Sequence, residues 1–137
     1  MARAPEQRNL TLILARSFAS QLATAVFLLD VEGTVIYYNE AAERLIGEPF
    51  VEGAGLRMDE WMARRRPLDE EGNEVPVESL PLGMTMLKRE PAYGVGRFRR
   101  GDGEYQRFAN VTFPLFAHTE DFVGVMAMAW HLDEDRR

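Results

Sequence analysis

Hydrophobic residues recur at helical spacing near the start of the chain. Within residues 6–23 they form a stripe that consists of Leu10, Ile13, Leu14, Phe18 and Leu22. Steps of three and four residues place side chains on one face of an α-helix. We therefore predict an amphipathic helix whose apolar face needs a partner. That partner is either a second copy of the chain or the chain's own sheet.

An unbroken apolar run, residues 25–30, follows this helix and predicts a strand that is covered on both faces. Asp30–Gly33 has the composition of a turn. Residues 34–38 are β-branched and aromatic, as is typical of a returning strand. A short helix should come next, capped by Asn39 and ended by Gly47.

The second half of the chain predicts more helix and then antiparallel sheet. Residues 50–77 are rich in Gly, Pro and charge, with a helical turn or two expected at 58–62, and residues 76–89 predict another helix. Three strands should follow, at 93–100, 104–116 and 122–131. The order of elements predicts an α+β fold, with a five-stranded antiparallel sheet and short helices on one face.

Composition and charge add to this fold prediction mainly by excluding classes of function. The chain has 137 residues, enough for one domain, and 46% of them are hydrophobic. A net charge of −6 argues against a nucleic-acid-binding surface. The chain has no cysteine, which excludes disulfides, thiolate metal sites and thiol chemistry. No apolar run approaches the ~20 residues of a membrane span, so we expect a cytoplasmic location and no membrane partner.

Two arginine clusters are the main polar feature. One is Arg64–Arg65–Arg66, and the other comprises Arg97, Arg99 and Arg100. Such clusters could bind anions locally. The more ordinary interpretation is that they are solvated faces and strand edges, and we expect this second interpretation to hold.

Four segments, in the right order, resemble the PAS domain family. FLLDVEGTVIYYNEAAERLIG at 27–47 resembles the opening hairpin and first helix of the family. Residues 77–82, the GDG turn at 101–103 and the late strand ending in Pro114–Leu115 resemble later parts of it. The resemblance implies a five-stranded antiparallel sheet wrapped by short helices, often around a cavity. It divides the chain into an N-terminal helix (1–23, dimer contact or cap), a PAS domain (24–132) and a short charged tail (133–137).

The function that the resemblance implies is a bacterial-type sensory or protein–protein interaction module in intracellular signalling. We expect a homodimer, formed through the helical stripe. His131–Leu132–Asp133–Glu134 replaces the Asp-Ile-Thr sequence that starts a coupling helix in many members, and the chain stops soon afterwards. We therefore expect it to act through a separate effector protein.

Catalytic and cofactor signatures are missing from the sequence. No phosphate-binding loop, nucleophile elbow or zinc-protease motif occurs, so we do not expect an enzyme. A flavin–thiol adduct needs a cysteine, and haem needs an axial ligand, usually His, from the helices at the cavity. The only histidines, His118 and His131, lie in a predicted turn and at a strand end. We expect no metal, haem or flavin.

The resemblance also implies which side chains face a cavity. These candidates are Phe27, Leu29, Ile36, Tyr38, Leu45, Met84, Leu87, Val111 and Phe113. Such a lining suits a small apolar ligand, fatty-acid-like or aromatic, which is uncharged or carries one carboxylate and is held by the Tyr38 hydroxyl. An arginine such as Arg57 or Arg97 could meet the carboxylate at the mouth. The alternative is that these side chains simply fill the core at ordinary density.

Overall fold

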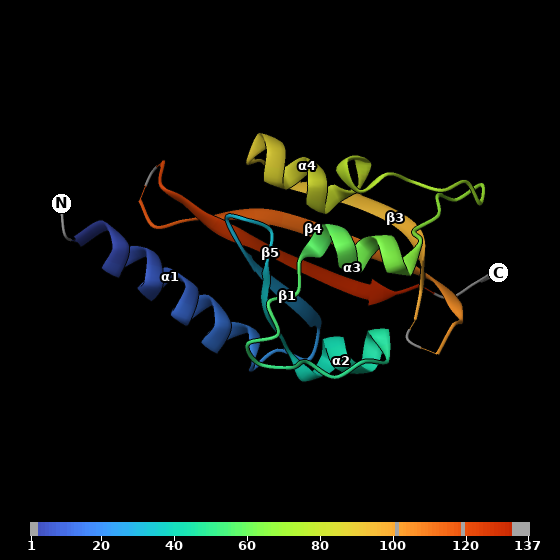
Figure 1. Ribbon diagram of the computed structural model, residues 1–137, viewed down its shortest axis with the longest axis horizontal. Coiled ribbons are helices and arrows are strands. Elements are labelled where there is room, and N and C mark those ends of the chain that lie inside the picture. Colours follow the sequence, from blue (N-terminus) through green and yellow to red (C-terminus); the bar gives the residue numbers. More distant parts are fainter. Residues whose placement is uncertain (1–2, 101, 119, 133–137) are drawn as a thin grey trace.

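The computed structural model describes residues 3–100, 102–118 and 120–132 of the chain, with side chains from residue 9 onward. Figure 1 shows the strands with helices on both sides of them. The elements in chain order are α1 (Arg3–Ala19), β1 (Ala25–Asp30), β2 (Val35–Tyr38), α2 (Glu40–Ile46), α3 (Met58–Arg65), the 3-10 turn η1 (Val77–Ser79), α4 (Pro81–Lys88), β3 (Ala92–Arg99), β4 (Tyr105–Phe116) and β5 (Phe122–His131). The expected tail at 133–137 lies outside the described residues.

The five strands form one antiparallel sheet in the order β2-β1-β5-β4-β3. This confirms the predicted α+β class. Most expected elements occur within a few residues of their predicted bounds, although α3 continues to Arg65, three residues beyond the expected helical turn. The helix predicted over 76–89 is divided at Leu80, where extended backbone separates η1 from α4.

Each face of the sheet carries its own hydrophobic cluster. On the inner face Phe27 and Leu29 pack with side chains of α2, α3 and α4. On the outer face Val26 and Leu28 pack with Met126 and with α1. Strand β1 is therefore covered on both sides, as its unbroken apolar run predicts.

A β-bulge in β2 changes which side chains share a face. Leu28 pairs with Tyr37, but the next residue, Leu29, pairs with Val35, so Ile36 is the extra residue. As a result Val35 and Tyr38 both belong to the inner cluster, while Ile36 packs in the outer one. Strict alternation along β2 would have placed Ile36 and Tyr38 together.

Helix α1 lies on the outer face of the sheet through a different side from the stripe that the sequence predicts. Leu12, Ala15 and Ala19 pack in the outer cluster together with Leu22, which follows the helix. The other four members of the predicted stripe remain 53–62% exposed: Leu10, Ile13, Leu14 and Phe18. We call these four the α1 stripe. The helix thus packs on its own sheet and still presents an apolar face to solvent.

A buried asparagine fastens the corner where α1, β1 and α2 meet. The Asn39 side-chain oxygen accepts hydrogen bonds from the backbone N–H of Ala42, as the cap of α2, and from that of Val26. Its amide nitrogen donates to the carbonyl oxygens of Ala19 and Thr24, at 2.8 and 2.9 Å. One side chain of 1% exposure therefore satisfies backbone groups from three elements.

No helix in the described ranges combines the length and the apolar character needed to cross a bilayer.

Gly124 allows β5 to lie close against β1. A Cβ atom built at this position would stand 2.2 Å from the carbonyl oxygen of Leu29 and 3.3 Å from the Leu12 side chain. Because backbone must shift to relieve such a contact, we expect Gly124→Ala to lower the free energy of unfolding by about 1–3 kcal/mol. Urea denaturation would measure the change. Gly96→Ala, whose Cβ would lie 3.0 Å from the Leu68 carbonyl oxygen, is the milder control. An equal loss in both variants would contradict this argument.

Candidate functional site

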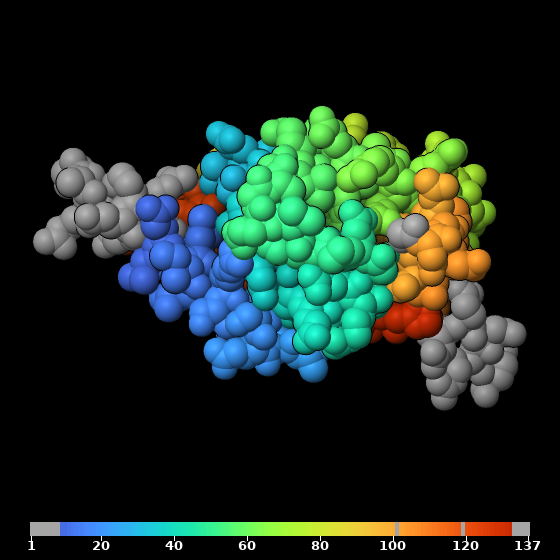
Figure 2. Space-filling model, turned by 60° about the horizontal axis from the view of Figure 1, so that its bottom comes forward, coloured from blue at the N-terminus to red at the C-terminus, as the bar shows by residue number. Residues whose placement is uncertain are grey.

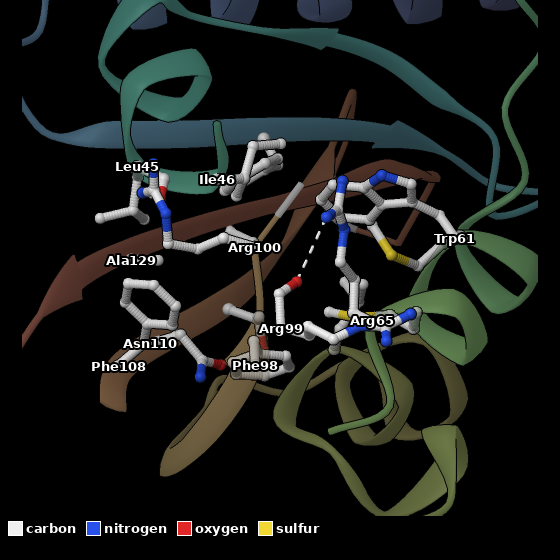
Figure 3. A pocket seen from close by; sticks show the side chains of 16 residues that line it. Leu45, Ile46, Trp61, Arg65, Phe98, Arg99, Arg100, Phe108, Asn110 and Ala129 are labelled. Carbon is white, nitrogen blue, oxygen red and sulfur yellow. Dashed lines mark hydrogen bonds between the residues drawn. The ribbon is translucent and has the colours of Figure 1, made fainter. Parts of the chain in front are cut away.

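A cavity of about 70 Å³ lies between the inner face of the sheet and helices α2, α3 and α4. Figure 3 shows its lining at close range. The apolar lining is formed by Phe27, Leu45, Ile46, Met58, Trp61, Met62, Leu82, Phe98, Phe108, Ala127 and Ala129. Polar side chains enter only from Asn110 and Thr112 and from three arginines at its edge. This lining favours an apolar ligand over a cation or a nucleotide.

Trp61 of α3 is the largest buried side chain of this wall. It is 3% exposed, and its ring stacks against Tyr38 and lies 5.6 Å from the ring of Phe27. Its indole N–H is buried and has no hydrogen-bond partner. Because Met58 and Met62 stand in the same wall, part of the lining is flexible and can adapt its shape.

The structure brings only some of the sequence candidates to the cavity. Phe27 and Leu45 line it. Leu29 and Tyr38 belong to the surrounding core but do not reach the cavity surface. The Tyr38 hydroxyl donates toward the carbonyl oxygens of Pro49 and Glu48, at 2.9 and 3.2 Å, so it holds a loop and not a ligand. Burial raises the pKa of this phenol.

The remaining five candidates do not face the cavity, so their predicted position is wrong. Ile36 and Phe113 belong to the outer cluster, and Val111 faces the same side because it pairs with Met128. On α4, Met84 and Leu87 are 40% and 76% exposed. The inward members of that helix are instead Leu82, which lines the cavity, and the fully buried Thr85.

The error in β4 has a physical cause. One face of this strand carries Ala109, Val111 and Phe113, and it is the more apolar of the two. The family resemblance predicted that Val111 and Phe113, on this face, point toward the cavity. In the structure this face meets the outer cluster, while Phe108 and Thr112 point inward. In a sheet that is covered on both faces, the more apolar side of a strand need not point toward the cavity, because each face packs against an apolar layer.

A second hollow adjoins the cavity and is polar. It is an open recess of about 430 Å³ lined by Glu48, Arg64, Arg65, Arg99, Arg100, Asp102 and Gly103. We call it the arginine recess. Arg65, Arg99 and Arg100 line both hollows, so the recess adjoins the cavity and these three side chains separate the two. The arginines named as mouth candidates from the sequence, Arg57 and Arg97, line neither.

Arg65 is the most buried charge of the recess, which corrects the expectation that its cluster is a solvated face. It is 8% exposed, lies over the Trp61 ring at 5.2 Å and forms an ion pair with Glu48 through Nη2. Its Nη1 donates to the carbonyl oxygen of Arg99 at 3.2 Å, the dashed line in Figure 3. Burial lowers the pKa of Arg65, and the charges of Arg99 and Arg100 lower it further.

Arg100 and the loop after α2 complete the rim of the recess. Arg100 donates from Nη1 to the carbonyl oxygens of Arg44 and Leu45, at the end of α2. The loop that carries Glu48 continues to Glu52, which pairs with Arg16 of α1 at 2.7 Å. In Figure 2 this loop lies directly beside α1. Across the described ranges no group of three acidic or histidine side chains is arranged to hold a metal ion.

Comparisons with known proteins agree with this architecture. A family model described as a PAS domain matches residues 14–84. No relative among curated proteins matches the sequence.

Solved structures similar to the chain are low in identity but cover most of it. The PAS domain of Bordetella pertussis BvgS is 16% identical, with 90% of this chain and 87% of that one covered and a TM-score of 0.61. A light-oxygen-voltage (LOV) protein of Rhodobacter sphaeroides is 15% identical, with 93% and 70% covered and a TM-score of 0.70. A LOV domain described with a flavin analogue is 17% identical, with 91% and 87% covered and a TM-score of 0.61. At these identities the likeness concerns the fold.

Proposed function

Because this chain belongs to the PAS domain family, we propose that it is a non-catalytic sensory module that works as a homodimer and signals through a separate protein. The observation that carries the dimer is the α1 stripe. Four large apolar side chains on one helix, each more than half exposed, form a patch of the kind that marks interaction surfaces.

The outer side of the sheet adds to this surface. Tyr93 and Trp130 are 63% and 39% exposed, and their ladder partners Val111 and Ala109 place both on the same side as α1. A second copy of the chain offers the matching apolar face, since a two-fold dimer joins the same patch of both subunits.

Native mass spectrometry of the purified chain tests the proposal, because it reports the number of subunits and any retained small molecule together. We expect a dimer at tens of micromolar. Leu14→Glu should weaken the dimer by more than about tenfold, since a buried charge would enter the interface twice. The fold should persist, because Leu14 is 59% exposed in the single chain.

Leu87→Glu is the matched control. Leu87 is even more exposed than Leu14 but lies on α4, with the helices of the inner face. This variant should remain dimeric. A full-length chain that is monomeric at these concentrations, or a dimer that Leu87→Glu weakens as much as Leu14→Glu, would argue against α1 as the contact. Deleting α1 is a poorer test, because deletion also uncovers Val26 and Leu28.

A second candidate function is the binding of a small apolar ligand, and the cavity favours it. The volume of about 70 Å³ is roughly half of the ~150 Å³ that accommodates benzene in an engineered core. The space as it stands therefore suits only a short, slender chain, and a larger ligand needs the wall to move. The flexible side chains of Met58 and Met62 could widen the space.

Flavin, the group named for one similar LOV structure, is not the ligand that we propose. Its three fused rings would need more space than the about 70 Å³ that the side chains leave here. The sequence also has no cysteine for a flavin–thiol adduct. Haem is not proposed either, since none of the described residues that line the cavity is a histidine.

A further inference from the structure

We propose that the arginine recess binds the carboxylate of a slender monocarboxylate ligand, which takes the place of Glu48 on Arg65 while its apolar chain enters the cavity. This inference rests on the second candidate function, ligand binding, and names the chemistry of that ligand. It starts from the position of the two hollows, since they lie on either side of the same three arginines and a ligand that displaces these side chains could reach both.

Charge in the recess favours an anion. Four arginines line it against two carboxylates, those of Glu48 and Asp102. Arg65 is nearly buried, and repulsion from Arg99 and Arg100 adds to the cost of its charge. An anion beside Arg65 offsets both costs, as Glu48 does in the chain alone and as a ligand carboxylate would in its place.

The bonding of Arg65 indicates which anion. The Nε and Nη2 atoms of a guanidinium share one edge, and a carboxylate can accept hydrogen bonds from both of them. Glu48 contacts Nη2, whereas the Nε of Arg65 is buried without a partner. A carboxylate with fewer constraints than Glu48 could span the edge and satisfy both nitrogens.

Glu48 itself shows that this position accepts a carboxylate. It lies on the loop after α2, and its side chain is 36% exposed, so it can turn toward water. Exchange of one carboxylate for another leaves the charge of the recess unchanged. The net free energy of binding then comes from burying the ligand's apolar chain beside Trp61 and Phe98 and from the added bond to Nε.

Three probes with short alkyl chains and different head groups test the inference: hexanoate, hexanamide and hexyl phosphate. Backbone amide signals of residues 61–65 and 98–100 would be followed by NMR during titration of the full chain. We expect saturable binding of hexanoate, and binding of hexanamide weaker by roughly tenfold, because only the ionised head group forms charge-assisted hydrogen bonds.

Two substitutions should change hexanoate affinity in opposite directions. Arg65→Met should weaken it by roughly tenfold and leave hexanamide unaffected. Glu48→Gln removes the competing charge and should raise hexanoate affinity severalfold, an effect that a merely structural role of Glu48 does not predict. The matched control is Glu52→Gln, four residues along the same loop, whose partner is Arg16 of α1. If Arg65→Met does not fold, the test is the comparison of Glu48→Gln with Glu52→Gln. Hexanoate affinity should rise in the first variant and stay unchanged in the second, and an equal effect in both would overturn the inference.

The outcomes separate the inference from the functions on which it rests. Equal affinity for hexanoate and hexanamide would overturn the carboxylate site but leave ligand binding intact. Tighter binding of hexyl phosphate would assign the recess to phosphate head groups and overturn it as well. If none of the probes binds, ligand binding itself fails, while the dimer is judged by its own experiment.

Discussion

Trp61→Ala should lower the free energy of unfolding by about 3–5 kcal/mol, the usual loss when a large aromatic side chain is removed from a core. The side chain is 3% exposed and contacts the rings of Phe27 and Tyr38 and the guanidinium of Arg65. Its removal would leave a void beside a cavity that already exists, so the neighbouring side chains have little to collapse against. This loss is a large fraction of the roughly 5–15 kcal/mol by which ordinary domains are stable.

Trp61→Phe is the control for this prediction. Phenylalanine keeps most of the apolar contact and removes the indole N–H, which is buried without a partner. We therefore expect a loss of no more than about 1.5 kcal/mol. Urea denaturation followed by far-ultraviolet circular dichroism would compare both variants with the parent. A similar loss for alanine and phenylalanine would mean that the indole N–H matters more than the packing.

Asn39→Ala should have an effect of similar size through hydrogen bonds instead of packing. The substitution removes the cap of α2, which alone is worth about 1 kcal/mol. It also leaves the N–H of Val26 and the carbonyl oxygens of Ala19 and Thr24 without this partner, at about 1–3 kcal/mol for each group that stays buried and unsatisfied. We expect a total loss of at least about 3 kcal/mol.

Asn39→Ser separates the two contributions. A serine hydroxyl can still cap α2 but cannot reach all the carbonyl oxygens on the other side, so an intermediate loss is expected. Asn73→Ala, in an exposed loop, serves as the surface control and should cost less than about 0.5 kcal/mol. A loss for Asn39→Ala as small as that of Asn73→Ala would show that water replaces the missing amide.

The order and type of the elements could be predicted because their signals are local. The apolar run of β1, the turn at Asp30–Gly33 and the cap at Asn39 each depend on a few neighbouring residues. The cavity lining depends instead on which face of each strand points inward. That direction is usually deduced from two rules: side chains alternate along a strand, and the more apolar side of a strand points toward the core. The bulge at Ile36 breaks the first rule, and the second fails because the sheet is covered on both faces.

The arginine recess was missed for a related reason. Arg65 and Glu48 are 17 residues apart, and Arg65 and Arg99 are 34 apart, so no spacing in the sequence links them. A run of three arginines is typical of solvated surface, and two of the three do remain exposed. The available signal was the position of Arg65 one helical turn after Trp61, on the same face of α3.

The strand order also bears on how the chain folds. Strands β1 and β2 are joined by a tight turn, and β3, β4 and β5 follow one another as a meander, so both sets can form through local contacts. The ladder between β1 and β5 pairs Ala25 with Ala129 and joins the two sets across most of the chain. Closing so long a loop costs more entropy than any hairpin does. We therefore expect the β1–β5 ladder to set the folding rate, and substitutions along it to slow folding more than equally destabilising changes in either hairpin.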